Sequence, residues 1–450
     1  MARLPSIYRF HDAVHDASVD FGNWTDPKSG SLRRGMVVAT RVRVLILLIV
    51  AIGSYAAYRW GDWRVQWEMR KVQVALRDFG AESALPTAER LLQLAPESGE
   101  SHMLMARVLR RLGRLDEVRR CLDRAAQLGI RQDRIDREEL MALAQVGQLE
   151  KALPHLPKLL ADPREDGADI CEAFINGFFV SHRFGEALRI LEAWEKDYPT
   201  DPRPYQFRGL YAVQNQAHND AAEQFGKAFR LAPHRWDIRL QYAVSLLNLN
   251  RASEAIELLR AMPADRKKEK RFELTLARAL TEIGELGDAE KLLRSLLETN
   301  SNDPDVLLAV ARLELDANRP NEALPLIEKA IAARSFDSEL RFAHGNALRL
   351  LGRQEEAKRE FEYVVKATDA RQRRQILKER LAANEGDMEA RYEMADLAVE
   401  FSPPSDRLFW LRSIVELDPR QKRAHQLLAD WYSERGEREE ADRHRKLAAE

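Results

Sequence analysis

Residues on which catalytic and metal sites depend are scarce in this sequence. Only two cysteines, Cys121 and Cys171, occur in 450 residues, and a pair so far apart provides neither a disulfide framework nor a zinc cluster. The motifs of serine hydrolases, zinc peptidases and nucleotide-binding folds are absent, and most of the ten histidines are scattered. We therefore expect no enzyme activity, no metal site and no cofactor.

One local exception is the pair His11 and His15, which a helix would place on one face with Asp12 and Asp16 beside them. That spacing can bind a divalent metal. No other histidine or cysteine lies nearby in the sequence to complete a coordination shell. We interpret these residues as solvated parts of a terminal arm.

An excess of charge of either sign is also missing. The formal net charge is −1 although 32% of the residues are charged, so the chain as a whole has no electrostatic attraction for nucleic acid or for an acidic membrane surface. The hydrophobic fraction of 45% is too high for a disordered chain, and the abundance of Ala, Leu, Glu and Arg favours helices. We expect a folded helical protein with no nucleic-acid partner.

Long apolar runs are rare, and a single one stands out near the amino terminus. Residues 44–58 carry no charge, and the run extends back to residue 38 if Arg41 and Arg43 direct their charged ends toward lipid headgroups. About 20 apolar residues are enough for a helix to cross a bilayer. The run predicts a transmembrane helix over 38–58. A buried core helix fits less well because a polar face is missing, and a cleavable signal peptide because the basic leader is long.

The charges around this segment predict its orientation. Residues 1–37 lack helix or strand periodicity, and we expect them to form a basic, flexible arm. Five basic residues precede the apolar run closely and four follow it. This bias favours a cytoplasmic amino terminus and places the rest of the chain in the periplasm or another extracytoplasmic space.

The remainder of the chain repeats a unit of thirty-four residues. From Gly209, steps of that length reach small residues at Ala243, Ala277, Ala311 and Gly345. Units are expected to open near Val65, Gly99, Asp133, Ala168, Pro202, Trp236, Lys270, Pro304, Ser338, Met388 and Lys422. Each holds two stretches with apolar residues at helical spacing, and such a hairpin buries its apolar faces only by stacking on neighbours.

This register resembles the tetratricopeptide repeat family, whose pattern of small, aromatic and proline residues is met at Gly209, Ala221, Phe225, Ala228 and Pro233. The resemblance implies an all-α fold, a right-handed superhelical solenoid of about eleven helix-turn-helix repeats that follows the transmembrane helix. Most units lack the leading tryptophan of the family.

The resemblance spans residues 65–450. Repeats one to nine are expected over 65–368, and repeats ten and eleven with a polar carboxy-terminal cap over 388–450. In the tenth unit, Ser402-Pro403-Pro404-Ser405 replaces the usual turn that contains glycine.

Extra residues separate the ninth and tenth units. Residues 369–387 are predicted to form a basic helical insertion, whose basic residues are Arg371, Arg373, Arg374, Lys378 and Arg380. Two interpretations remain open: an extra helix that kinks the solenoid or covers its rim, or a docking surface for acidic partners. A nucleic-acid role is disfavoured because no aromatic residues are interleaved with the charges.

The resemblance also implies that the first helix of each unit lines a concave groove for an extended peptide or a partner helix. Carried over by register, the candidate groove residues are Met103, Arg107, Arg110, Arg134, Arg137, Met141, Asn176, Phe179, Arg278, Arg312, Phe342, Asn346 and Arg349. The four early arginines would bind carboxylates, and the two methionines would contact apolar side chains. The alternative is a solvated arginine-rich rim balanced by Glu100, Glu138 and Glu139.

Two functions follow from these patterns. One is a membrane-anchored adaptor whose groove binds a protein or peptide partner, with acidic and apolar residues, in envelope assembly, secretion or maturation. The other is a structural scaffold that holds subunits of a large membrane-associated complex through its convex face or edges. Neither partner identity nor oligomeric state can be derived from the residues.

Overall fold

The computed structural model describes residues 63–264 and 266–449. Within them all regular elements are helices and no strand occurs. Contacts divide the chain into two units, residues 1–67 and 68–450. The predicted arm (1–37) and membrane helix (38–58) lie outside the described residues. Of the helices that are described, none combines the length and the apolar character needed to cross a bilayer.

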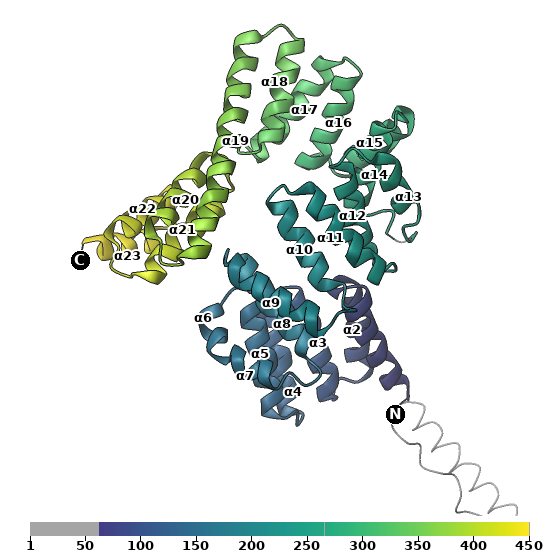
Figure 1. The fold of residues 1–450 in the computed structure, drawn as a ribbon, viewed down its shortest axis with the longest axis vertical. Coiled ribbons are helices and arrows are strands. Elements are labelled where there is room, and N and C mark those ends of the chain that lie inside the picture. The colour runs from purple at the N-terminus through teal and green to yellow at the C-terminus, as the bar shows by residue number, and fades with distance from the viewer. Residues whose placement is uncertain (1–62, 265, 450) are drawn as a thin grey trace, which may run out of the picture. The chain divides into compact units, whose positions relative to one another are not determined.

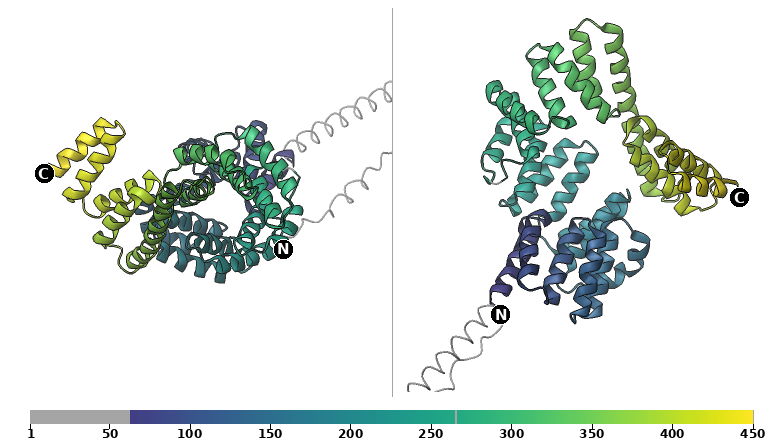
Figure 2. Two further views of the ribbon diagram at one scale, coloured as in Figure 1. Left: turned by 90° about the horizontal axis from the view of Figure 1, so that it is seen from above. Right: turned by 180° about the vertical axis from the view of Figure 1, so that it is seen from behind.

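Consecutive helices form antiparallel pairs that stack along the chain, as Figure 1 and, from two further directions, Figure 2 show. Residues 68–78 are helical and pair with α2 (Ala81–Leu94). The first helices of the later pairs are α3 (Gly99–Arg111), α5 (Gln132–Gln145), α8 (Gly167–Val180), α10 (Arg203–Gln214), α12 (Trp236–Leu247), α14 (Lys270–Glu282), α16 (Pro304–Asp316), α18 (Ser338–Leu350), α20 (Met388–Phe401) and α22 (Lys422–Glu434). Each begins within one residue of the start expected from the 34-residue register.

The second helices complete the pairs. They are α4 (Leu115–Gln127), α6 (Leu149–Ala152) with η1 (Leu153–His155) and α7 (Leu156–Ala161), α9 (Phe184–Asp197), α11 (His218–Leu231), α13 (Ala252–Arg260), α15 (Leu286–Thr299), α17 (Pro320–Ala333), α19 (Gln354–Ala383), α21 (Pro404–Leu417) and α23 (Arg438–Ala449). The second helix of the third pair is broken because Pro154 and Pro157 lack the N–H that a continuous helix uses.

A single left-handed residue makes the turn inside most pairs. Its φ lies between 54° and 85° at Gly113, Gly147, His182, Gln216, Asn250, Gly284, Asn318, Gly352 and Gly436. An L-residue other than glycine pays about 1–2 kcal/mol for this conformation, so glycine is favoured here but not required. In the tenth pair Ser402 is extended, with φ −147°, because two prolines follow it.

Small residues allow the two helices of a pair to approach closely, as the register predicts. A Cβ added at Gly209 would lie 2.7 Å from Cε1 of Phe225, and one added at Gly345 would lie 2.7 Å from Cε1 of Phe361. Both distances are shorter than any van der Waals contact. The aromatic ring therefore occupies the space that a side chain would need.

The predicted insertion is not a separate helix. Residues 369–383 are the second half of α19, which runs for 30 residues without interruption. No proline or glycine occurs between 354 and 383, so nothing in the sequence ends the helix at the usual length. Leu377 and Leu381 are buried in the core that α19 shares with the last two pairs.

Segments far apart in the sequence meet where the fourth pair touches the ninth and tenth. The ring of His182, in the turn between α8 and α9, lies 4.8 Å from the ring of Phe409 and 5.0 Å from that of Trp410, measured between centroids. Lys378 Nζ lies 5.4 Å from the ring centroid of Phe184. We call the following residues the closing contact: His182, Arg183, Phe184, Lys378, Glu385, Phe409 and Trp410, with Arg183 and Glu385 joined at 3.4 Å.

Acid should weaken the closing contact. Burial, aided by the charge of Lys378, lowers the pKa of His182 from 6.5 to about 4. Between pH 6.5 and pH 4 the His182 side chain is therefore protonated in the unfolded chain but neutral in the folded chain. The stability that is present above pH 6.5 is lost as the pH falls toward 4. Between pH 7.5 and pH 5 the loss should be about 2 kcal/mol. Urea unfolding at the two pH values measures it.

The variant His182→Asn is the control, because asparagine tolerates the left-handed turn and does not titrate. Between pH 7.5 and pH 5 this variant should lose about 2 kcal/mol less stability than the wild type. An identical pH dependence of the two proteins would contradict a role for His182.

Candidate functional site

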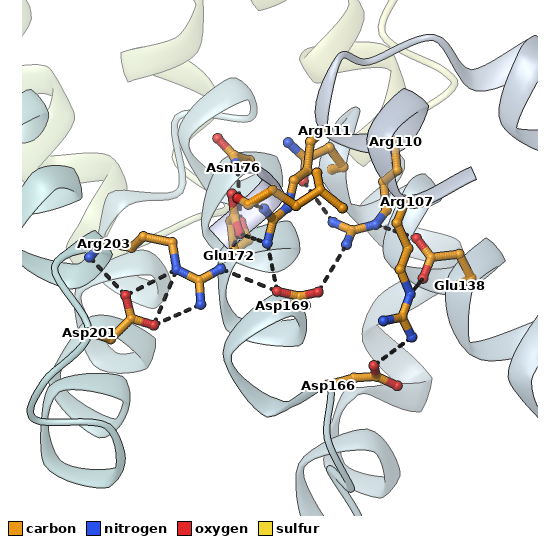
Figure 3. A network of polar contacts seen from close by, with 12 residues as sticks. Arg107, Arg110, Arg111, Glu138, Asp166, Asp169, Glu172, Asn176, Asp201 and Arg203 are labelled. Carbon is orange, nitrogen blue, oxygen red and sulfur yellow. Dashed lines mark hydrogen bonds and ion pairs between the residues drawn. The ribbon is translucent and has the colours of Figure 1, made fainter. Parts of the chain in front are cut away.

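Charged side chains from the first helices of four consecutive pairs, and from the residues just before α8 and α10, form one network, which Figure 3 shows. Helix α3 contributes arginines, α5 and α8 contribute carboxylates, and α10 begins with another arginine. The members are Arg107, Arg110, Arg111, Glu138, Asp166, Asp169, Glu172, Asp201 and Arg203. The predicted early arginine group therefore lies among carboxylates of its own chain.

The centre of the network is a fully buried ion pair. Arg110 Nε donates to Glu138 Oε1 at 2.6 Å, and both side chains are no more than 1% exposed. Arg110 Nη2 also lies 3.7 Å from a carboxylate oxygen of Asp169. A guanidinium in this position cannot reach a partner protein, since no part of it faces solvent.

Asp169 and Glu172 link α3 to α10. Arg111 Nη2 donates to Asp169 Oδ1 at 2.7 Å, and Arg203 Nη1 donates to Glu172 Oε2 at 2.6 Å. Burial alone would raise the pKa of Asp169, but the charges of Arg111, Arg110 and Arg203 outweigh it and hold this pKa below its ordinary value. The carboxylate is thus ionised, and the network is compensated from within.

The other early arginines also have partners in the chain. Arg107 Nη2 donates to Asp166 Oδ1 at 2.8 Å, and Arg137 Nη2 donates to the carbonyl oxygen of Asp162 at 2.9 Å. Arg134 pairs with Glu100. Two of the three glutamates of the alternative interpretation, Glu100 and Glu138, are therefore observed partners, and the exposed Glu139 is not in the network. A peptide-binding role for these arginines stays a prediction.

Four further candidates lie close to this region. Met103 and Met141 are core residues, 2% and 1% exposed, so neither offers an adaptable surface. Asn176 donates to the carbonyl oxygen of Glu172 at 2.9 Å. Phe179 is half-buried and packs edge-on against Phe184.

The remaining candidates lie on later pairs, outside the network. Arg278 donates to Asn248 Oδ1 at 2.8 Å and Arg312 pairs with Glu339 at 3.0 Å, both in exposed positions. Phe342 is 50% exposed. Asn346 is half-buried and Arg349 is exposed. These residues remain accessible to a partner.

A cavity of about 920 Å³ lies beside the closing contact. Its walls come from pairs four, five, eight, nine and ten, and the lining residues are His182, Val213, Gln214, Asn215, Gln216, Asp305, Arg334, Phe336, Asp337, Ser338, Glu339, Ala367, Thr368, Arg371, Gln372, Arg374, Gln375, Ile376, Lys378, Met394, Ala398, Phe401, Ser402, Pro403, Asp406 and Trp410. Its volume lies within the usual range of ligand sites, roughly 300–1,000 Å³.

Sequence reasoning found part of this arrangement. It missed Asp169 and Arg203, although the register held a signal: Asp169 and Arg203 are 34 residues apart, as are Glu100 and Arg134, so each pair occupies equivalent positions in adjacent units. Residues one unit apart lie side by side in a solenoid. The cavity had no such signal because its walls are not neighbours in the sequence.

Breaking the buried pair at the centre of the network should be costly. Glu138→Leu leaves Arg110 buried beside a single distant carboxylate, and we expect a loss of about 3–5 kcal/mol in the free energy of unfolding. Urea unfolding followed by circular dichroism measures it.

The double variant Arg110→Met, Glu138→Leu is the control. It removes both charges while Arg111 keeps Asp169 and Arg107 keeps Asp166, and we expect most of the lost stability to return. A double variant as unstable as the single one would contradict this account of the network.

Comparison with known proteins gives the repeat type. The tetratricopeptide repeat models match residues 212–273, 274–335 and 308–371. No curated protein sequence shows significant similarity to the chain.

The solved structures that match the chain have low sequence identity to it. The human IFIT1 dimer with PPP-AAAA is 15% identical and covers 85% of this chain and 99% of its own, with a TM-score of 0.40. PilW, a widely conserved type IV pilus biogenesis factor, is 19% identical and covers 44% of this chain and 91% of its own, with a TM-score of 0.38. The match to the APC/C hetero-tetramer Cut9-Hcn1 is 14% identical in sequence. It covers 78% of this chain and 82% of the matched chain, with a TM-score of 0.34.

The family matches and the helix pairs agree on the kind of unit that builds the chain. Residues 212–371 are tetratricopeptide repeats, and the described part of the chain is an all-helical solenoid of tetratricopeptide-like pairs.

Proposed function

We propose that this chain is a membrane-anchored adaptor that binds a segment of a partner protein, with the partner acting in envelope assembly, secretion or maturation. The observation that carries the proposal is the cavity, because its lining is drawn from five helix pairs and includes both charged and apolar side chains. Tetratricopeptide repeats generally serve as protein-binding modules, which supports a protein partner. No catalytic activity is part of the proposal.

The binding surface of the proposal lies on the later pairs. In the early network every arginine has a carboxylate or carbonyl partner within the chain, so an incoming carboxylate would have to displace one. Phe342 and Arg349, in contrast, are exposed on α18, and α19 places polar side chains in the cavity. A partner segment would therefore engage the carboxy-terminal half of the solenoid.

The membrane part of the proposal is supported by sequence alone. The apolar run at 38–58 and the basic residues before it favour an anchored chain with its amino terminus in the cytoplasm and its repeats outside.

A scaffold that uses the convex face is the second candidate. It is favoured by apolar side chains that are exposed away from the cavity, such as Leu286 and Leu417, which are 50% and 48% exposed. Such residues are also found singly on ordinary surfaces. Blocking the cavity separates the two candidates.

Filling the cavity should prevent capture of the partner. Gln372 lines the cavity and is exposed to it, and Gln372→Trp would fill part of the space. We expect at least a five-fold drop, roughly 1 kcal/mol, in partner recovered by cross-linking and mass spectrometry from native membranes.

The matched control is Gln127→Trp on α4, an exposed position that does not line the cavity; it should capture as much as the wild type. Undiminished capture by Gln372→Trp would favour the scaffold.

Topology gives a separate test of the anchor. Protease added on the extracytoplasmic side should degrade the repeats and leave an amino-terminal epitope tag protected, and deletion of residues 38–58 should release the chain from the membrane fraction. Cleavage of the repeats only after the cytoplasm is opened would reverse the assigned orientation, and continued membrane association of the deletion variant would overturn the anchor.

A further inference from the structure

One face of α19 presents three cations to the cavity. Arg371, Arg374 and Lys378 follow one another at helical spacing and all line it. Arg371 Nη2 donates to Ser338 Oγ at 3.1 Å, and Arg374 Nη1 donates to the carbonyl oxygen of Phe401 at 3.1 Å and to Ser402 Oγ. Lys378 contacts the ring of Phe184 in the closing contact. We call these three residues the α19 cation site.

None of the three has an ion pair within 4.0 Å among the described residues. Two neighbouring cations on the same half of the helix do have one: Arg373 pairs with Glu393, and Arg380 pairs with Asp387 at 2.9 Å. The three cations that line the cavity therefore lack the ion pairs that Arg373 and Arg380 make on the same half of the helix.

Burial also destabilises the charged forms of two members of the α19 cation site. Burial lowers the pKa of Arg374 and of Lys378, and in each case a neighbouring cation of the site lowers it further. The carboxylate of Asp406 opposes both of these pKa shifts, and its own pKa is raised by burial although Arg374 and hydrogen bonds from Ser402 and Ser405 oppose that rise. A partly buried positive charge of this kind is stabilised by an anion that enters the cavity.

The other carboxylates of the cavity are already engaged. Asp305 pairs with Arg334 at 2.5 Å and Glu339 with Arg312 at 3.0 Å. Asp337 caps α18, accepting hydrogen bonds from the backbone N–H groups of residues 339 and 340. These groups leave α19 uncompensated.

The wall formed by α16 and α18 carries these carboxylates together with Arg312 and Arg334, so among the described residues it offers no second cluster of unpaired cations. A segment with one or two carboxylates can contact the three cations of α19, whereas a longer polyphosphate chain would find no further unpaired cation on that wall. Apolar side chains lie beside the α19 cation site, including Ile376, which is 48% exposed, and Trp410. The lining therefore suits an acidic residue flanked by apolar ones.

We propose that the α19 cation site binds the carboxylate side chains of an acidic, apolar segment of the partner protein. This inference rests on the adaptor function proposed above. It places the binding site of the partner at residues 371–378 and identifies the interaction as binding of carboxylates by cations. The guanidinium of Arg371 and the ammonium of Lys378 would donate to the carboxylate oxygens, and Arg374, held by the Phe401 carbonyl, would add its charge.

The test is direct binding to the purified full-length chain. The probe is a fluorescein-labelled peptide of alternating aspartate and leucine, compared with the same peptide carrying asparagine in place of aspartate and with a 5′-phosphorylated oligoadenylate of similar length. We expect the aspartate peptide to bind at least tenfold more tightly than either, with an affinity that falls as salt rises.

Two variants with equal loss of charge locate the site. Arg371→Gln with Lys378→Gln should weaken binding of the aspartate peptide at least tenfold. Arg359→Gln with Arg373→Gln removes the same charge from exposed positions of α19 that do not line the cavity, and should change binding less than twofold. Arg374 is left in place because it holds Phe401 and Ser402, and circular dichroism checks that both variants melt like the wild type.

The outcomes distinguish this site from the adaptor function. Equal binding by the two variants, or tighter binding of the oligoadenylate or the asparagine peptide, overturns the α19 cation site. If the wild type captures a partner from membranes and the Arg371→Gln, Lys378→Gln variant captures it equally, the site is wrong and the adaptor stands. If the wild type captures nothing, the adaptor fails, and the peptide measurement still decides the site.

Discussion

Burial of apolar faces between neighbouring helix pairs is the constraint on which the structure depends. A single pair leaves much of its apolar surface in water, so each must stack on the next. Close approach within a pair follows from the same need, and at Gly209 and Gly345 the ring of a phenylalanine fills the place of a side chain. Only the surface that this packing does not bury is available to bind a partner.

The charged side chains are distributed in accordance with this packing. In the early pairs arginines and carboxylates at equivalent positions of adjacent units neutralise one another, as Asp169 and Arg203 do. This arrangement satisfies buried groups without leaving them free for a ligand. Along α19 the pattern differs, because Arg371, Arg374 and Lys378 line the cavity without an ion pair among the described residues, whereas Arg373 and Arg380 are paired.

The sequence was informative wherever the physics is local. A small residue every thirty-four positions located the helix pairs, since it is required by contacts within one unit. It also placed Arg110 on a first helix but not its burial, because Glu138 comes from the next unit. The cavity could not be predicted from the sequence, because His182 and Trp410 share no periodicity. Their contact depends on the curvature of the solenoid over many helix pairs. The continuity of α19 was not predicted, although the absence of any proline or glycine between residues 354 and 383 was a signal for it.

The closing contact changes how such a chain would fold. A solenoid held only by nearest neighbours can nucleate anywhere and fray from its ends. Contact between the fourth pair and the tenth adds a loop of more than two hundred residues whose ends must find each other, which raises contact order and slows the last step of folding. The pairs between them would then lose their independence, and the region around the cavity would unfold as one cooperative block.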